Sequence, residues 1–538
     1  MISNLLDKVY PFYASACLIG AGVISLFFGL SKRRTYKLLV ITLTACAIIG
    51  ALFLNIYSFN QRGDFSDYLF SFGSLQVLMT TLVLFAALNI LLFISLNSFE
   101  KDDFIKIIII FIWCIFCFTF FIPSSNFIMV FSSLIFLVIG IFHLVSSLNR
   151  GIQSKFLSEY SVKNNIIRFF LLSALSLLLI FLGYSLIFGS TDFKTFTQII
   201  ESDYKDSTLV KTGFFIILSG IYMFLGLVPL HSPYMKMQRR IEYSSMLIVW
   251  FLYIPAGVYM FLKLKDVLFY FLGGNNYYLI AALLVLSAAC VLGGNIGAIK
   301  TTSIRRIFSF LVLPVMGIII LGFVQYGLGL IDAQIVLKHT MANLILIGIV
   351  YFPVITVFYA IEKSGETDAL EKIRGFGRKN IYMGINITII LLAFGGLIGT
   401  YGYFTRIFIA SPYINNFQAI LKPDSSGGFA ASLNIGSMLL TFVAWTFIAA
   451  NIIRLLIIIF SKNHESAKII LTGNGRNSQD DFENKTGTNS INAPIPKFLY
   501  VYITFFTLII IVSGILGIFE VLNINMNFFD FSILTLNL

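Results

Sequence analysis

Charged side chains are scarce in this sequence, and their scarcity excludes most classes of soluble protein. Only 12% of the 538 residues are Asp, Glu, Lys or Arg, whereas soluble domains carry about a quarter. Hydrophobic residues make up 58% of the chain, and its mean hydropathy is +0.91. A chain of this composition cannot remove its apolar surface from water by folding alone, so we expect a protein embedded in lipid.

Acidic residues, histidines and cysteines are also few. The formal net charge is +12, but the basic residues lie in short segments between apolar runs, so membrane topology explains them better than a nucleic-acid partner does. The five cysteines lie within apolar runs. Cys114 and Cys117 have the spacing C-x-x-C, but no further Cys or His is nearby, which favours packing over metal binding. We expect no cofactor and no metal in this chain.

Long apolar runs are the main feature of the sequence. The run at 107–122, IIIIFIWCIFCFTFFI, is apolar on every face, which indicates a membrane helix rather than an alternating barrel strand. Windows of this kind predict an all-α polytopic membrane protein with about 14 transmembrane helices. The predicted spans are 10–30, 37–58, 74–97, 104–122, 127–148, 167–188, 212–230, 243–262, 277–298, 306–325, 334–360, 381–409, 432–460 and 498–522.

Basic residues cluster in the connections that follow odd-numbered spans. Examples are Lys32 to Arg34, Lys236 to Arg240, and Lys372 to Lys379. The positive-inside rule therefore predicts that the odd connections face the cytoplasm or matrix and that both termini lie on the opposite side. The polar segment 463–497 is low in aromatic residues and is predicted to be a flexible loop.

Two predicted spans contain residues that disrupt helices. Pro229 and Pro233 end the seventh span, and a glycine-rich stretch at Gly395–Tyr403 interrupts the twelfth. Broken helices at membrane depth usually line a polar path, often in paired repeats. Gly226 and Gly396 begin similar short motifs 170 positions apart, which fits two related units.

Three segments carry a resemblance to a known family. They are GLVPLH at Gly226–His231, LGGNIGAIKTTSIRRIFSF at Leu292–Phe310 and LLAFGGLIGTYGYFTRIFI at Leu391–Ile409. In this order and at this spacing they resemble segments of the antiporter-like membrane subunits of respiratory complex I, which are shared with multisubunit cation/proton antiporters. NADH dehydrogenase subunit 2 is the most similar branch, and the resemblance covers most of the chain.

This resemblance implies about 14 helices in which helices 4 to 8 and 9 to 13 form two inverted five-helix repeats, with helices 7 and 12 broken. The implied divisions are 1–100 for helices 1 to 3, 101–264 for the first antiporter-like repeat, 265–462 for the second, 463–497 for the polar loop, and 498–538 for helix 14 and the C-terminal tail.

The resemblance also implies a function. The chain would be a membrane-arm subunit of proton-translocating NADH:ubiquinone reductase, coupling electron transfer in other subunits to proton movement, with no redox centre of its own. Its implied partners are other membrane-arm subunits and phospholipid, with quinone bound elsewhere in the complex. The implied location is the mitochondrial inner membrane, in an organelle-encoded protein, with a bacterial plasma membrane as the alternative.

The implied proton chemistry uses a Glu on helix 5, a Lys on each of helices 6, 7 and 8, and a Lys or Glu on helix 12. Protons hop between such groups because each charge moves the pKa of the next group. This sequence departs from the pattern at nearly every position. The expected positions hold His143, Arg168, Phe224, Tyr253 or Ile254, and Arg406.

Six ionisable residues are candidates for a proton path or an electrostatic axis: His143, Arg168, Lys263, Lys338, His339 and Arg406. Histidine exchanges protons near neutral pH, but a guanidinium group does not release its proton, so both arginines are expected to stabilise water or anions. Lys338 and His339 are adjacent in helix 11, so at most one of them faces the polar interior, and Lys338 is the favoured one. The expected helix-break residues are Pro229, His231, Gly396 and Gly399, where the His231 ring serves the freed backbone or a proton path.

Three functions remain open. The first is a working proton-translocating subunit of complex I. The second is a structural subunit of the same complex with a degenerate proton path, which the missing helix 7 lysine favours. The third is a component of a multisubunit cation/proton antiporter, which the same missing groups disfavour.

Overall fold

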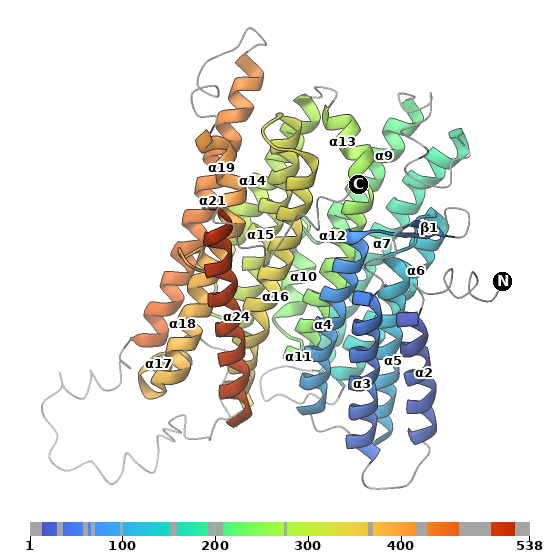
Figure 1. Cartoon of the computed structure of the whole chain (residues 1–538), viewed down its shortest axis with the longest axis vertical. Helices are drawn as coiled ribbons and strands as arrows, with labels where there is room; N and C mark the ends of the chain where they lie inside the picture. Colours follow the sequence, from blue (N-terminus) through green and yellow to red (C-terminus); the bar gives the residue numbers. More distant parts are fainter. Residues whose placement is uncertain are drawn as a thin grey trace, which may run out of the picture. The chain divides into compact units, whose positions relative to one another are not determined.

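The structure is a computed structural model of the chain, drawn in Figure 1. It describes residues 13–29, 36–57, 63–65, 70–96, 101–150, 159–191, 198, 208–273, 277–363, 370–415, 428–461 and 497–521. The predicted loop at 463–497 lies outside the described residues except for Lys497, which begins a helix.

The described residues form two compact units. The first contains the residues up to Ala282 together with Phe323–Met341, and the second contains Leu283–Gly322 and the residues from Ala342 onward. Three helices contribute residues to both units: α14 (Tyr277–Lys300), α15 (Ile304–Gly327) and α16 (Ala333–Lys363).

Helices build the first unit. They are α2 (Tyr13–Gly29), α3 (Tyr36–Tyr57), α4 (Ser74–Leu96), α5 (Lys101–Phe121), α6 (Phe127–Leu148), α7 (Glu159–Thr191), α9 (Thr208–Phe224), α10 (Ser232–Gln238), α11 (Tyr243–Ile248), the π-helical turn η4 (Val249–Tyr253), α12 (Ile254–Lys263) and α13 (Lys265–Gly273). The segments α11, η4 and α12 follow one another without a gap, so residues 243–263 form one continuous helical stretch.

The second unit is also helical. Beside its parts of α14, α15 and α16 it contains the 3₁₀ turn η5 (Leu370–Ile373), α17 (Phe376–Lys379), α18 (Ile381–Gly395), α19 (Tyr401–Asn415), α21 (Gly428–Phe460) and α24 (Lys497–Val521).

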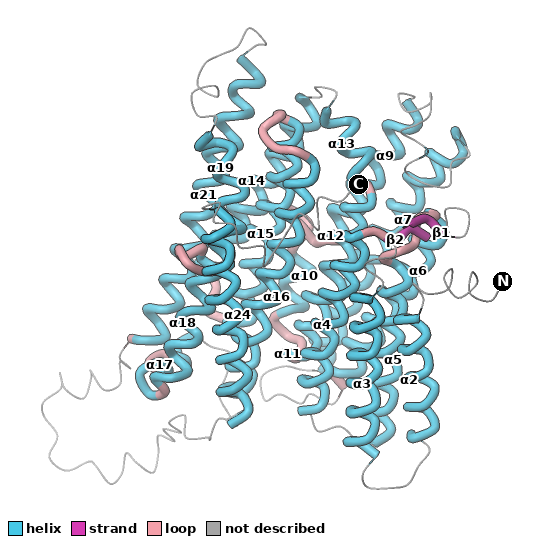
Figure 2. Tube along the Cα trace, in the orientation of Figure 1, coloured by secondary structure: helices cyan, strands magenta, loops and turns pink. Residues whose placement is uncertain are grey.

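One feature departs from the all-α prediction. A short hairpin pairs β1 (Gly63–Phe65) with β2 (Phe70–Phe72) in antiparallel register, with Asp64 opposite Ser71 (Figure 2). Three residues per strand leave no periodicity that a scan for apolar runs could detect.

The prediction of a polytopic helical membrane protein is confirmed. Helix is present in every predicted span. Within the described ranges, ten helices are long and apolar enough to cross a membrane, and shorter apolar helices lie at Ala14–Ser25, Thr208–Phe224, Ile381–Gly395 and Phe498–Gly514. The all-round apolar character of these helices is what lipid requires of a spanning segment.

Small residues let α7 and α9 pack closely, and this contact positions the first helix break. A Cβ atom on Gly183 would lie 2.5 Å from the carbonyl oxygen of Gly213, and one on Gly213 would lie 2.6 Å from that of Gly183. About two turns after Gly213 in α9, a Cβ on Gly220 would lie 3.0 Å from the Ser176 carbonyl oxygen of α7. Close backbone approach through glycines is the usual packing of helices in membranes, and here it holds α9 against α7 up to the point where α9 ends.

Candidate functional site

The first helix break separates α9 from α10, as the sequence predicted. Gly226 has φ of +61°, a left-handed conformation that favours glycine. Its N–H donates to the Met223 carbonyl at 3.0 Å, and the Leu227 N–H donates to the Tyr222 carbonyl at 3.4 Å. These two bonds form the glycine-based cap that ends many helices. Helix resumes at Ser232, directly after Pro229 and His231.

The second break separates α18 from α19 and repeats the same cap. Gly396 has φ of +85°, its N–H donates to the Ala393 carbonyl at 3.0 Å, and the Leu397 N–H donates to the Leu392 carbonyl at 3.0 Å. Gly399, at φ of +86°, turns the chain again before α19 begins at Tyr401. Both predicted interruptions are therefore present, and both have the same hydrogen-bond pattern.

The residue two positions before each capping glycine is a phenylalanine whose carbonyl oxygen receives a side-chain donor. In the first unit, the Tyr253 hydroxyl donates to the Phe224 carbonyl at 2.8 Å. In the second unit, Nη2 of Arg406 donates to the Phe394 carbonyl at 3.3 Å. A neutral phenol and a cation thus occupy comparable places at the two breaks.

Arg406 is buried, with 3% of its surface exposed. Its Nε and Nη1 atoms are buried and make no hydrogen bond to the described residues. Beside it, the Trp445 indole N–H donates to the Gly395 carbonyl at 3.1 Å, so the last two carbonyls of α18 are both occupied. A cation at the C-terminal end of a helix is stabilised by the helix dipole, which favours this place for a guanidinium inside a membrane.

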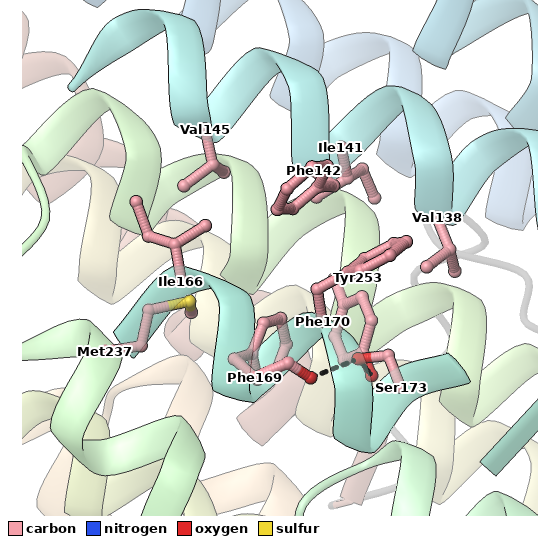
Figure 3. Close-up of a pocket in the computed structure, with 10 residues that line it drawn as sticks. All are labelled: Val138, Ile141, Phe142, Val145, Ile166, Phe169, Phe170, Ser173, Met237 and Tyr253. Carbon is pink, nitrogen blue, oxygen red and sulfur yellow. Dashed lines mark hydrogen bonds between the residues drawn. The ribbon is translucent and has the colours of Figure 1, made fainter. Parts of the chain in front are cut away.

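The interior of the first unit is aromatic where the implied amines would lie. The Phe224 and Tyr253 rings stack with centroids 4.2 Å apart, and the Tyr253 hydroxyl also shares a hydrogen bond of 2.7 Å with Ser173. Next to them is a cavity of about 10 Å³ (Figure 3). Its lining residues are Val138, Ile141, Phe142, Val145, Ile166, Phe169, Phe170, Ser173, Met237 and Tyr253. Such a volume holds about one water at most, and only Ser173 and Tyr253 carry polar side chains there.

Lys263 lies elsewhere in the first unit, at the end of α12. Its Nζ donates to the carbonyls of Ile122 at 2.9 Å and Ser124 at 2.5 Å, directly after α5 ends. The rings of Tyr259 and Phe121 lie 4.9 and 5.7 Å from Nζ. Lys263 forms no ion pair with a described carboxylate.

His143 and Arg168, predicted for helices 5 and 6, both have exposed side chains on the surface of the described chain. Lys338 is partly exposed, whereas His339 is buried with 1% of its surface exposed. Of the adjacent pair in α16, the histidine is therefore the residue that points inward. The structure does not bring His143 or Arg168 into the cluster around Tyr253 or to the carbonyls that hold Lys263.

Sequence reasoning missed three polar residues that the structure places in contacts. Ser173 bonds Tyr253, Asn451 donates to the Asn295 side chain at 3.1 Å, and Arg454 donates to two carbonyls at the end of α14. An ionisable residue inside an apolar run, such as Arg454 in ANIIRLL, is the signal that could have identified the last of these. No group of three His, Cys, Asp or Glu side chains that could hold a metal occurs in the described part of the chain.

Comparison with known proteins identifies a matching family, described as NADH:quinone oxidoreductase/Mrp antiporter, TM, over residues 133–417. A protein of Laribacter hongkongensis named NADH-quinone oxidoreductase subunit N is 22% identical over 252 residues, which are 46% of this chain and 50% of that protein. A protein of the same name from Flavobacterium johnsoniae is 21% identical over 411 residues, 73% of this chain and 82% of that protein. With Laribacter and several similar bacterial relatives, the match spans about half of the relative's length.

Two solved structures share the fold. A chain of respiratory complex I from Thermus thermophilus with bound aureothin aligns with a TM-score of 0.65 and 14% identity, covering 94% of this chain and 97% of that one. A chain of the Mrp complex from Dietzia sp. aligns with a TM-score of 0.73 and 14% identity, covering 96% and 95%.

Proposed function

Since this chain belongs to the NADH:quinone oxidoreductase/Mrp antiporter transmembrane family, which matches more than half of its length, we propose that it is a membrane-arm subunit of respiratory complex I. In this role it couples electron transfer from NADH to quinone, carried out by other subunits, to proton translocation. The names of its bacterial relatives and the fold shared with a complex I chain support this assignment. The chain contributes to the NADH:ubiquinone reductase without a redox centre or cofactor of its own.

The proposed architecture has 14 membrane helices and two inverted repeats, at 101–264 and 265–462, after helices 1 to 3 at 1–100. The loop at 463–497 and helix 14 with the tail at 498–538 complete it. The observation that carries this proposal is the repeated cap at Gly226 and Gly396, 170 positions apart, with a donor on the carbonyl of the phenylalanine two positions before each.

Within this architecture the second repeat carries a buried charge at its helix break. Arg406 keeps a permanent positive charge at the broken helix, because a guanidinium does not lose its proton at ordinary pH. It tunes neighbouring water and titratable groups electrostatically and does not carry a proton itself. Arg168, Lys338 and His339 complete the proposed electrostatic axis, with His339 the inward-facing member of its pair, and the exposed His143 is proposed not to carry protons.

The first repeat has a weakened path. Phe224 and Tyr253 fill positions that the family gives to amines, and the apolar cavity beside them offers a water few hydrogen-bond partners. This observation favours the second candidate function, a structural subunit of the same complex in which the first repeat does not conduct protons.

The proposed partners are the other membrane-arm subunits and phospholipid, with quinone bound elsewhere in the complex. The named relatives are bacterial, which favours the plasma membrane of a bacterium. The prediction of a mitochondrial inner membrane, and of an organelle-encoded protein, has no support among these relatives.

Affinity purification of the tagged chain from the cells that encode it tests the assignment. Purification together with NADH:quinone reductase activity is the expected result. Recovery with cation/proton antiport but without NADH oxidation would instead favour the antiporter alternative, for which the fold shared with the Mrp chain is the support.

A further inference from the structure

In each unit, a basic side chain near the C-terminal end of one helix donates hydrogen bonds to backbone carbonyls at the C-terminal end of another helix. In the first unit, Lys263 closes α12 and binds the carbonyls of Ile122 and Ser124, which follow the last residue of α5. One turn earlier on α12, the Tyr259 hydroxyl donates to the same Ile122 carbonyl at 2.8 Å. Two side chains of one helix thus satisfy the carbonyls of two residues in the turn that directly follows α5.

The second unit contains a matching arrangement. Arg454 of α21 donates from Nη1 to the Ala298 carbonyl at 3.1 Å and from Nη2 to the Thr301 carbonyl at 3.5 Å, at the C-terminal end of α14. About one turn earlier on α21, Asn451 donates to the Asn295 side chain at 3.1 Å. Again a cation and a polar residue of one helix hold the end of another.

The two pairs of helices correspond under the proposed repeats. In the proposed numbering α5 and α14 are the first helices of the two repeats, and α12 and α21 are the last. Each cation therefore ties the first helix of its repeat to the last one. This correspondence rests on the proposed function for the division into repeats, whereas the hydrogen bonds themselves do not depend on it.

We propose that Lys263 and Arg454 are corresponding positioning residues, and that Lys263 acts as a fixed charge rather than as a proton carrier. Its contacts are two carbonyl oxygens at the negative end of a helix dipole and two aromatic faces, and all of them stabilise the ammonium form. Arg454 makes the same kind of contact with a group that does not release its proton.

The substitution Lys263→Arg separates a fixed charge from a proton carrier. Arginine keeps the charge and the donors for both carbonyls but does not exchange a proton, whereas Lys263→Met removes both properties. In the intact complex, we expect Lys263→Arg to keep the wild-type ratio of protons pumped per electron. We expect Lys263→Met to lower the ratio of folded to unfolded chain by about tenfold, because carbonyls at the end of α5 lose their donor.

Three further variants complete the experiment. Arg454→Lys should retain assembly and Arg454→Met should lose it, in parallel with the Lys263 variants. Lys106→Met is the control, because Lys106 is an exposed lysine whose ion pair, at 3.7 Å, is with Asp103 of its own helix. Hydrogen exchange at residues 115–126 and 294–303, measured on the purified complex, should rise in the matching methionine variant and stay unchanged in the control.

Loss of proton pumping in an assembled Lys263→Arg complex would show that Lys263 carries protons and would overturn the proposal. Unchanged assembly and hydrogen exchange in both methionine variants would overturn the positioning role. These results are distinguishable from failure of the proposed function, because exchange and assembly can be measured in whatever complex the chain is purified with, even one that does not oxidise NADH.

Discussion

Tyr253 donates its hydroxyl hydrogen to the carbonyl oxygen of Phe224 at 2.8 Å while the two rings stack with centroids 4.2 Å apart. A single side chain therefore both satisfies a backbone group released by the break after α9 and fills the space beside it with carbon. In the second unit the carbonyl of Phe394 receives Arg406 instead. This difference, a phenol in one unit and a guanidinium in the other, is the physical basis for assigning the buried charge to the second unit.

Replacing Tyr253 by Phe tests whether its hydroxyl is structural. The substitution removes the bonds to Phe224 and Ser173 and should destabilise the protein by about 1–3 kcal/mol, because buried polar groups lose their partners. Thermal unfolding of the purified protein measures this loss. The number of protons pumped per electron should not change, and a changed ratio in fully assembled complex would mean that the hydroxyl belongs to a working path.

The helix break in the second unit depends on glycine at position 396. An alanine there would have to adopt φ of +85°, and its Cβ would lie 2.8 Å from Nε1 of Trp445 and 3.0 Å from Cγ of Arg406. The left-handed conformation alone costs roughly 1–2 kcal/mol for a residue with a side chain.

Gly396→Ala should therefore lower the unfolding temperature measurably. Gly50→Ala is the matched control, since Gly50 lies in α3 with no atom within 4 Å of the added Cβ, and alanine there should gain about 0.5–1 kcal/mol. Equal stability of the two variants would mean that the cap at Gly396 does not shape the break.

The positions of the helix breaks could be predicted from the sequence, because proline and glycine act through their own backbone preferences. The breaks at Pro229 and at Gly396 were found in this way. The direction of a side chain on an apolar helix could not be predicted, because helices that are apolar all round carry no stripe that marks the inner face. For this reason the exposure of His143 and Arg168 could not be predicted, although their positions along the helices matched those implied by the family.

Contacts between distant segments could not be predicted from the sequence either. Lys263 meets carbonyls about 140 positions earlier in the chain, and Arg454 meets carbonyls more than 150 positions earlier. No local pattern encodes these pairs, which arise only when the helices pack. The sequence could indicate that basic residues such as Lys263 and Arg454 lie in membrane helices. It could not indicate that their partners are backbone carbonyls at helix ends rather than carboxylate side chains.

The orientation in the membrane gives a separate prediction. Lys379 has an exposed side chain and lies in a basic connection that the positive-inside rule places on the inner side. A membrane-impermeant amine reagent applied to intact cells or sealed vesicles should leave Lys379 unmodified, as read by mass spectrometry, until the membrane is permeabilised. Lys205 lies in an even-numbered connection and is the outer-side comparison. Labelling of Lys379 without permeabilisation would contradict the predicted topology.

Arg406 is proposed to supply a fixed charge that proton translocation needs, whereas His143 is proposed not to carry protons through the first repeat. The most direct measurement is the number of protons pumped per electron by vesicles containing the Arg406→Met or the His143→Gln complex, at matched amounts of assembled protein. Arg406→Met should lower this ratio or the yield of assembled complex, and His143→Gln should leave both close to wild type. An assembled His143→Gln complex that oxidises NADH without pumping would contradict the account.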